Sequence, residues 1–274
     1  RVLLWIVGIP LALFLILLAL SQTKLPPAFF RLQHPVLIRA AGRDAQWHQD
    51  LRYLSTELPR LHANAFYQVP EEAWRAAVAG LDARITQLSD DQIAVELRRL
   101  VAMIGDGHTQ LYAGGGDRTR VYPLALRWFP EGLAVVAAAP DYRETIGARV
   151  VAIDDTVIRA AYDAVAPLIS RDNEAALLTA SPQLLTSPEV LFVLGITRAT
   201  DRATYLVEGA DGVQRAVEVR AYDGASGDLQ LLDALDLDPA LAGSPPLFLS
   251  HREDYYWFEY LPESGTLFFQ YNRC

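Results

Sequence analysis

The stretch MIGDGHTQLY, residues 103–112, places a histidine in a short turn between a helical pattern and a strand-like pattern. Gly105 and Gly107 flank Asp106, and glycine readily adopts the positive φ angles that other residues avoid. Asp106 is expected to accept backbone N–H bonds in an Asx-type turn, which would hold His108 rigidly. A histidine held in this way can orient or activate a nucleophile from another segment. The alternative is structural, with Asp106 closing the loop and His108 making one hydrogen bond.

Three amphipathic helices are predicted upstream of this turn. The first begins near Asp44, the second at Pro70, with glutamates in its first turn, and the third at Ser89, in a capping box. Gly105 follows the third helix, where a C-terminal glycine is expected. Each helix carries an apolar stripe at helical spacing. The stripes are Trp47, Leu51, Leu54, Leu58 and Leu61, then Trp74, Val78, Leu81 and Ile85, and then Ile93, Leu97, Leu100, Val101 and Ile104.

Beyond the turn the pattern changes to short strands. A short strand is expected at 109–113, a strand pair at 121–129 and 133–139, and a hairpin around Asp211-Gly212. The remaining elements are a strand at 149–153, a helix after the Asp154-Asp155 turn, a helix at 187–196, a loop-rich connector over 223–246, and two aromatic strands, YYWFEYL (255–261) and GTLFFQYN (265–272). The final strand is so apolar that it needs a sheet partner, and the preceding residues supply only one. The chain is therefore interpreted as ending at the start of a further domain.

The segment Val2–Leu20 has no charged residue. As a helix it would be about 28 Å long, close to the thickness of a bilayer's hydrocarbon core. We expect residues 1–21 to anchor the protein in a membrane. The alternative is a signal peptide cleaved near Ala19-Leu20-Ser21. In either case the rest of the chain is expected outside the cytoplasm, in a periplasmic or extracellular space.

The composition and the motif inventory exclude several classes of function. The net charge is −9, and the arginines are scattered, so no basic surface for nucleic acid is expected. The single cysteine, Cys274, rules out an internal disulfide. No nucleophile elbow, phosphate-binding loop, dinucleotide motif or paired-cysteine zinc motif is present, and no cofactor is expected. Ser21 and Lys24 have the S-x-x-K spacing, but the proline-rich linker offers no burial to activate the lysine.

Other candidate residues have simple structural interpretations. Asp106 and His108 lack a third ligand nearby in sequence, so no metal site is predicted. Asp172-Asn173-Glu174 is interpreted as the N-cap of a helix that starts at residue 175, with a functional role as the alternative. The remaining histidines have no companions in sequence and are expected at the surface or in packing: His34, His48, His62 and His251.

The order of three stretches resembles the C-terminal-processing (tail-specific) serine peptidases, in the branch related to tricorn protease cores. They are WHQDLRYLSTELPRLHANAFY (47–67), LRRLVAMIGDGHTQLY (97–112) and YPLALRWFPEGLAVVAAAPDYRETIGARVVAID (122–154). The resemblance covers roughly residues 45–272, and GDGHT is its most specific element. It implies a degenerate PDZ-like module in which GARVVAIDDTVI replaces the usual strand and turn. Ala148-Arg149 and Asp155 depart from that pattern.

The resemblance also implies a catalytic role for one residue. His108 corresponds to the histidine of the family's D-x-H-[ST] motif, which takes part in catalysis in the tricorn-like branch. Asp106 and Thr109 would be its supports. The catalytic serine, its oxyanion-hole glycines and the lysine would follow Cys274 in a C-terminal α/β core. The stretch TLFFQYN resembles the first strand of that core.

The predicted fold is therefore α+β, with an N-terminal membrane helix, a small helical domain, a PDZ-like β/α module and the first strands of a truncated α/β peptidase core. The expected boundaries are 1–21 for the anchor or signal segment, 22–43 for a linker, 44–116 for the helical domain, 117–221 for the PDZ-like module, and 222–274 for the connector and the start of the core. The expected function is the N-terminal part of an exported, membrane-anchored serine peptidase acting on proteins or peptides. The alternative is a non-catalytic, membrane-tethered peptide-binding or scaffold protein. The expected partners are a protein or peptide substrate and the membrane, without nucleic acid.

Overall fold

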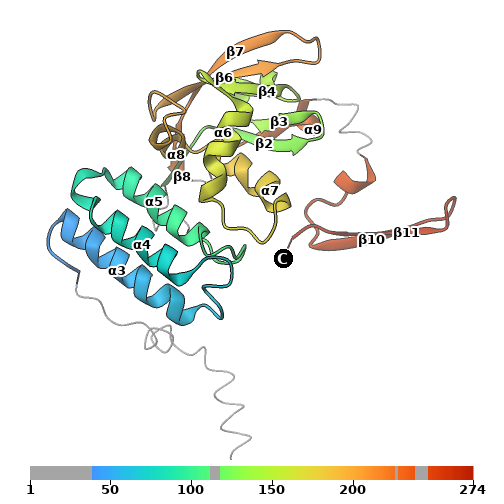
Figure 1. The fold of residues 1–274 in the computed structure, drawn as a ribbon. Coiled ribbons are helices and arrows are strands. Elements are labelled where there is room, and N and C mark those ends of the chain that lie inside the picture. The colour runs from blue at the N-terminus through green and yellow to red at the C-terminus, as the bar shows by residue number, and fades with distance from the viewer. Residues whose placement is uncertain (1–38, 112–117, 226–227, 238–245, 274) are drawn as a thin grey trace, which may run out of the picture. The chain divides into compact units, whose positions relative to one another are not determined.

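The computed structural model describes residues 39–111, 118–225, 228–237 and 246–273 (Figure 1). The chain divides into two units, residues 1–49 and 50–274. The first unit contributes the beginning of helix α3 (Arg43–Leu61). The GDGHT turn and the sheet both lie within the second unit.

Within the described residues, no helix combines the length and the apolar character needed to span a bilayer. The longest, α3, has 19 residues but carries charged side chains from Arg43 to Arg60. The expected anchor, residues 1–21, lies outside the described residues. The predicted fold class with a membrane helix and the predicted membrane-anchored localisation are therefore corrected, and the described chain has a mixed α/β fold.

The three helices before the GDGHT turn form as predicted. They are α3, α4 (Glu71–Asp82) and α5 (Asp90–Ala102), with the short 3-10 turn η1 (Ile85–Gln87) before α5. Ser89 closes the capping box, because its Oγ accepts the Gln92 N–H and the Gln92 Oε1 accepts the Ser89 N–H. Trp74 is fully buried, and its indole N–H donates to the Leu100 carbonyl at 2.9 Å, which ties α4 to α5.

A seven-stranded antiparallel sheet follows, with the order β2-β3-β4-β6-β7 and two short strands beside β4 and β3. The strands are β2 (Leu124–Phe129), β3 (Gly132–Ala138), β4 (Arg149–Ile153), β5 (Thr156–Val157), β6 (Arg202–Glu208), β7 (Gln214–Arg220) and β9 (Leu232–Asp233). The other elements are β1 (Arg118–Val121), which pairs with β8 (Tyr222–Ala225), the helices α6 (Ile158–Val165), α7 (Ala175–Leu184), α8 (Pro188–Val193) and α9 (Ala234–Leu237), and the 3-10 turns η2 (Pro140–Thr145), η3 (Ala166–Leu168) and η5 (Leu247–Leu249). The predicted strand pair and hairpin are confirmed.

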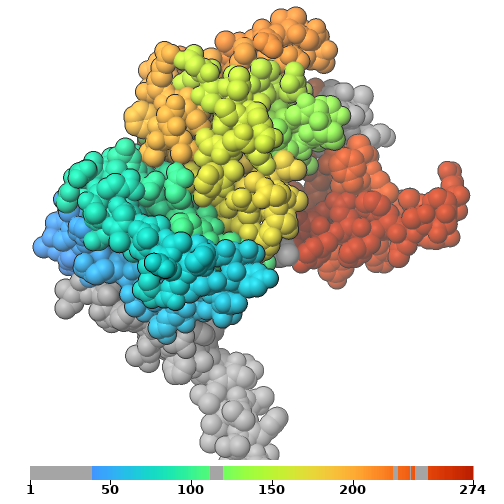
Figure 2. Space-filling view, in the orientation of Figure 1, coloured from blue at the N-terminus to red at the C-terminus, as the bar shows by residue number. Residues whose placement is uncertain are grey.

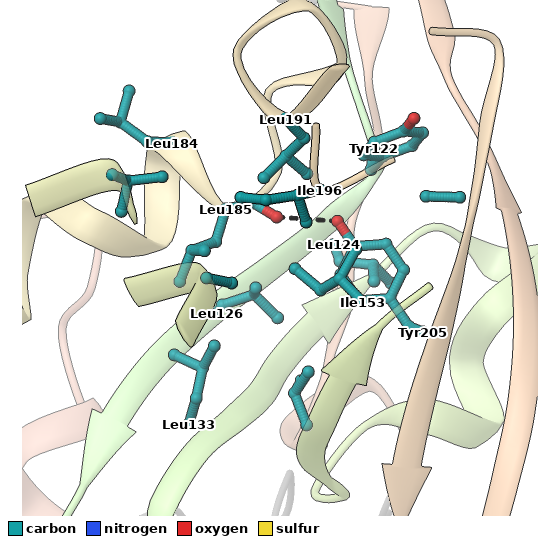
Figure 3. Packing of buried hydrophobic residues seen from close by; sticks show 14 of the residues in the cluster. Tyr122, Leu124, Leu126, Leu133, Ile153, Leu184, Leu185, Leu191, Ile196 and Tyr205 are labelled. Atoms are coloured by element: carbon teal, nitrogen blue, oxygen red, sulfur yellow. Dashed lines mark hydrogen bonds between the residues drawn. The ribbon is translucent and has the colours of Figure 1, made fainter. Parts of the chain in front are cut away.

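The core of this sheet lies beneath α6 and α7, which pack on β4 and β2 respectively (Figure 1). Along β6, Ala203, Tyr205 and Val207 are buried and alternate with more exposed residues, the period expected of a strand with one covered face. The Tyr205 hydroxyl donates to the Leu185 carbonyl at 2.8 Å, the dashed line in Figure 3. Tyr122 meets the Tyr205 ring edge-on, with centroids 5.8 Å apart.

The two aromatic strands also form, as β10 (Tyr256–Leu261) and β11 (Thr266–Tyr271), paired with each other in a hairpin shown in red in Figure 2. One face of the hairpin, called the aromatic face below, consists of three cross-strand pairs: Tyr256 with Tyr271, Phe258 with Phe269, and Tyr260 with Leu267. These six side chains are 58–67% exposed. On the opposite face Trp257 is buried and contacts Phe268.

The strand predicted at 109–113 is not observed. Residues 109–111 are irregular, and residues 112–113 lie outside the described part of the chain. The backbone here is held by bonds within the turn, described next, and pairs with no strand of the described residues.

Candidate functional site

The turn at 105–109 begins with Gly105, where both the backbone angle and the neighbouring side chain favour glycine. Gly105 has φ +75° and donates its N–H to the Ala102 carbonyl at 3.1 Å, which ends the last turn of α5. A Cβ added at Gly105 would lie 2.7 Å from both Cβ and Cγ of Gln68. The predicted role of Gly105 at the helix end is therefore confirmed.

Asp106 is the centre of the turn, and the predicted Asx-type turn is confirmed. Its Oδ1 accepts the His108 N–H at 3.0 Å, and its carbonyl accepts the Thr109 N–H at 3.0 Å. Its Oδ2 accepts the Thr109 hydroxyl at 2.6 Å and lies 2.9 Å from His62 Nε2. These donors hold the pKa of the Asp106 carboxyl well below its usual range, with the Thr109 hydroxyl contributing most, then the His108 N–H and then His62.

This lowered pKa predicts an acid-dependent loss of stability. A carboxylate with a depressed folded-state pKa stabilises the fold fully above its unfolded-state pKa, about 3.9, and loses that contribution as pH falls through the folded-state pKa. Urea unfolding of the wild type and of Asp106→Asn should therefore show a stability difference that is constant above about pH 5 and shrinks below about pH 4. Asp141→Asn, in η2, serves as the control and should show a smaller difference. A wild-type advantage that stays unchanged down to about pH 2 would contradict this account.

His62 was expected to have no companion, and that expectation is wrong. Its Nδ1 accepts the Asn64 N–H at 3.1 Å, which leaves the ring proton on Nε2 to be donated to Asp106. Forty-four positions separate the two residues, so no local pattern could have indicated the pair.

His251 also has partners, since its Nδ1 lies 3.2 Å from Asp254 Oδ2 and its ring packs on Trp257. His34 lies outside the described residues.

His108 has a fixed backbone and an exposed ring. Its N–H is bonded to Asp106, but its side chain is 96% exposed, and its Nδ1 lies 3.8 Å from Asp106 Oδ1, too far for a hydrogen bond. Within the described residues, the imidazole makes none of the hydrogen bonds that a purely structural role would use. The ring is accessible to a group that approaches from elsewhere.

Gly107 does not have the positive φ that was predicted for it. Its N–H donates to Asp172 Oδ1 at 3.0 Å, and an added Cβ would lie 2.7 Å from Asp172 Oδ2. The glycine therefore permits the close approach of a carboxylate from a distant segment. The neighbouring Asn173 accepts the Ala176 N–H at 3.1 Å through Oδ1, whereas the N-cap residue of α7, Glu174, makes no side-chain capping bond, so the predicted capping is confirmed only for the Asn173 side chain.

The fold thus brings together Asp106, His108 and Asp172, whose potential ligand atoms lie within 4.8 Å of one another. Two carboxylates and an imidazole are a donor set that divalent transition metals accept. However, both oxygens of Asp106 already accept hydrogen bonds, and Asp172 holds Gly107. These hydrogen bonds account for the closeness of the two carboxylates to the turn.

A separate apolar groove lies beside β3. It has a volume of about 440 Å³ and is lined by ten residues that include Phe129, Val135, Ile146 and Arg149. No residue of the 105–109 turn lines it, so the two features are distinct.

No family model matches the chain, and no curated protein matches it. Among solved structures, the structure of this chain is similar to the structure of mature CPAF complexed with lactacystin. CPAF is a chlamydial serine protease. The TM-score is 0.51, with 15% sequence identity over 77% of this chain and 40% of the CPAF chain. A second structure of mature CPAF has a TM-score of 0.48 with 15% identity over 66% of this chain and 35% of that one, too low a score to add weight.

The likeness to CPAF concerns the fold alone. Membership of the C-terminal-processing family is not shown. The chain spans less than half the length of the CPAF chain.

Proposed function

We propose that this chain is the N-terminal part of a serine-type peptidase that hydrolyses peptide bonds in proteins or peptides, with His108 as its catalytic base. The observation that carries the proposal is the turn at 105–109, in which hydrogen bonds at Gly107, His108 and Thr109 fix the His108 backbone while its ring stays exposed. The similarity of the fold to that of CPAF supports it, as does the resemblance of GDGHT to the tricorn-like histidine motif.

In this reaction a serine from the remainder of the protein attacks the carbonyl carbon of the scissile peptide bond. His108 accepts the proton of the serine hydroxyl during the attack and returns it to the leaving amine. Water then releases the acyl group, again with His108 as the base. Asp106 and Thr109 do not touch the substrate in this proposal, and they support His108 by holding the turn.

The aromatic face is a second support for a longer protein. An isolated two-stranded hairpin is marginally stable in water. At about 200 Å² for each side chain, roughly 60% of it exposed, the six side chains present about 700 Å². The largest apolar patch on a typical soluble monomer is about 300–600 Å². We propose that residues 222–274 begin the catalytic core, whose remainder covers this face, and that 44–116 and 117–221 are the two preceding domains.

A serine-reactive fluorophosphonate probe tests the proposed function on the full-length protein that contains this chain. We expect one serine, located beyond residue 274 by mass spectrometry, to be labelled, and an unstructured protein such as casein to be cleaved. Prior inactivation by the probe should abolish cleavage. Absence of both labelling and cleavage would exclude the peptidase.

The alternative is a non-catalytic peptide-binding or scaffold protein. The observation that favours it is the apolar groove beside β3, which has room for a few side chains of an extended peptide and includes Arg149 in its lining. The same experiment separates the two functions, because a binding protein neither reacts with the probe nor cleaves casein.

A further inference from the structure

We infer that Asp172 is a positioning residue for His108. Its carboxylate holds the Gly107 N–H and thereby fixes the turn that presents the imidazole. This role rests on the proposed function and adds a residue that the resemblance does not include.

The contact between Asp172 and the turn is specific in both partners. The Gly107 N–H donates to Asp172 Oδ1 at 3.0 Å across 65 positions of sequence. A Cβ at position 107 would lie 2.7 Å from Asp172 Oδ2, so the carboxylate would have to turn away and its bond to the residue 107 N–H would be disturbed. The glycine and the carboxylate therefore depend on each other.

The segment that carries Asp172 is itself anchored on both sides. Arg171 donates to the Ala166 carbonyl at 3.1 Å and to Glu174 Oε1 at 3.2 Å. Asn173 caps the start of α7 through the Ala176 N–H. The bonds of Arg171 and Asn173 fix the backbone around Asp172, and the bond from the Gly107 N–H to Asp172 then fixes the turn.

Asp106 and Asp172 have different tasks in this arrangement. The bonds of Asp106 to His108 and Thr109 lie inside the turn, and its bond to His62 reaches the residue that follows α3. Asp172 holds the turn from the segment between η3 and α7. Because the His108 ring makes no hydrogen bond within the described residues, its location depends on its backbone, which these two contacts fix.

The kinetic test uses the full-length protein with a peptide substrate. A displacement of a catalytic group by about 1 Å can cost about 100-fold in rate. We expect Asp172→Ala to lower kcat about 10- to 100-fold with KM within about twofold. Asp172→Asn retains an acceptor for the Gly107 N–H and should restore kcat to within about threefold of the wild type. Asp141→Ala, the matched exposed carboxylate in η2, should have no effect. Equal loss in the Asn and Ala variants, or a change confined to KM, would overturn the positioning role.

A second test does not require activity and uses the full-length protein. Amide hydrogen exchange measured by NMR should be slower at Gly107 in the wild type than in Asp172→Ala, and Asp172→Asn should retain most of the protection. Equal exchange in wild type and Asp172→Ala would overturn the contact on which the role depends. Protection that appears only with added Mn²⁺ and disappears with EDTA would assign Asp172 to a metal and also overturn it. A wild-type protein without peptidase activity would refute the proposed function, and the exchange experiment would still decide the contact.

Discussion

Replacing His108 with alanine in the full-length protein is expected to lower kcat for peptide hydrolysis by about 10²- to 10⁴-fold, the usual contribution of a general base. KM should change little, because the ring is exposed and is proposed to act on the serine proton. Fluorophosphonate labelling should slow in parallel, since the probe needs the same activated serine.

The control for this experiment is His48→Ala, in helix α3, which should retain wild-type kinetics. Circular dichroism should show that His108→Ala remains folded, because the ring makes no hydrogen bond within the described residues. Hydrolysis and labelling at wild-type rates in His108→Ala would remove His108 from the mechanism.

The largest expected loss of stability comes from Trp74→Ala, which should lower the free energy of unfolding by about 3–5 kcal/mol. Trp74 is fully buried, contacts the Phe66 ring at a centroid distance of 5.9 Å, and donates its indole N–H to Leu100. Its removal leaves a cavity between α4 and α5 and an unpaired carbonyl. Urea unfolding followed by circular dichroism measures the loss.

A graded control separates these two contributions. Trp74→Phe keeps much of the apolar contact but removes the indole N–H, so its loss should be about 1–3 kcal/mol, mainly from the unpaired Leu100 carbonyl. A loss below about 1 kcal/mol in Trp74→Ala would show that α4 and α5 do not depend on this side chain.

Local patterns predicted the local structure well. The capping box at Ser89, the helix-ending Gly105 and the Asx-type turn at Asp106 depend on residues within a few positions of each other, so the sequence contains the whole interaction. The alternating strands around the Asp211-Gly212 turn formed for the same reason.

Contacts between distant residues could not be predicted in this way. His62 is hydrogen-bonded to Asp106 across 44 positions of sequence, and Asp172 to Gly107 across 65. No sequence motif around His62 or Asp172 indicates these partners. Gly107 illustrates the limit, because the glycine was expected for a positive φ and instead lies in close contact with the Asp172 carboxylate. The pairing of β1 with β8, roughly a hundred residues apart, was likewise beyond local patterns.

In the proposed peptidase, His108 faces a catalytic serine from the remainder of the protein. The most direct measurement is the distance between the His108 ring nitrogens and the Oγ of the probe-reactive serine in an experimental structure of the full-length protein. The proposed mechanism predicts a separation of about 2.6–3.2 Å, or somewhat longer without substrate. A reactive serine more than about 6 Å from His108, or hydrogen-bonded to a different base, would contradict it.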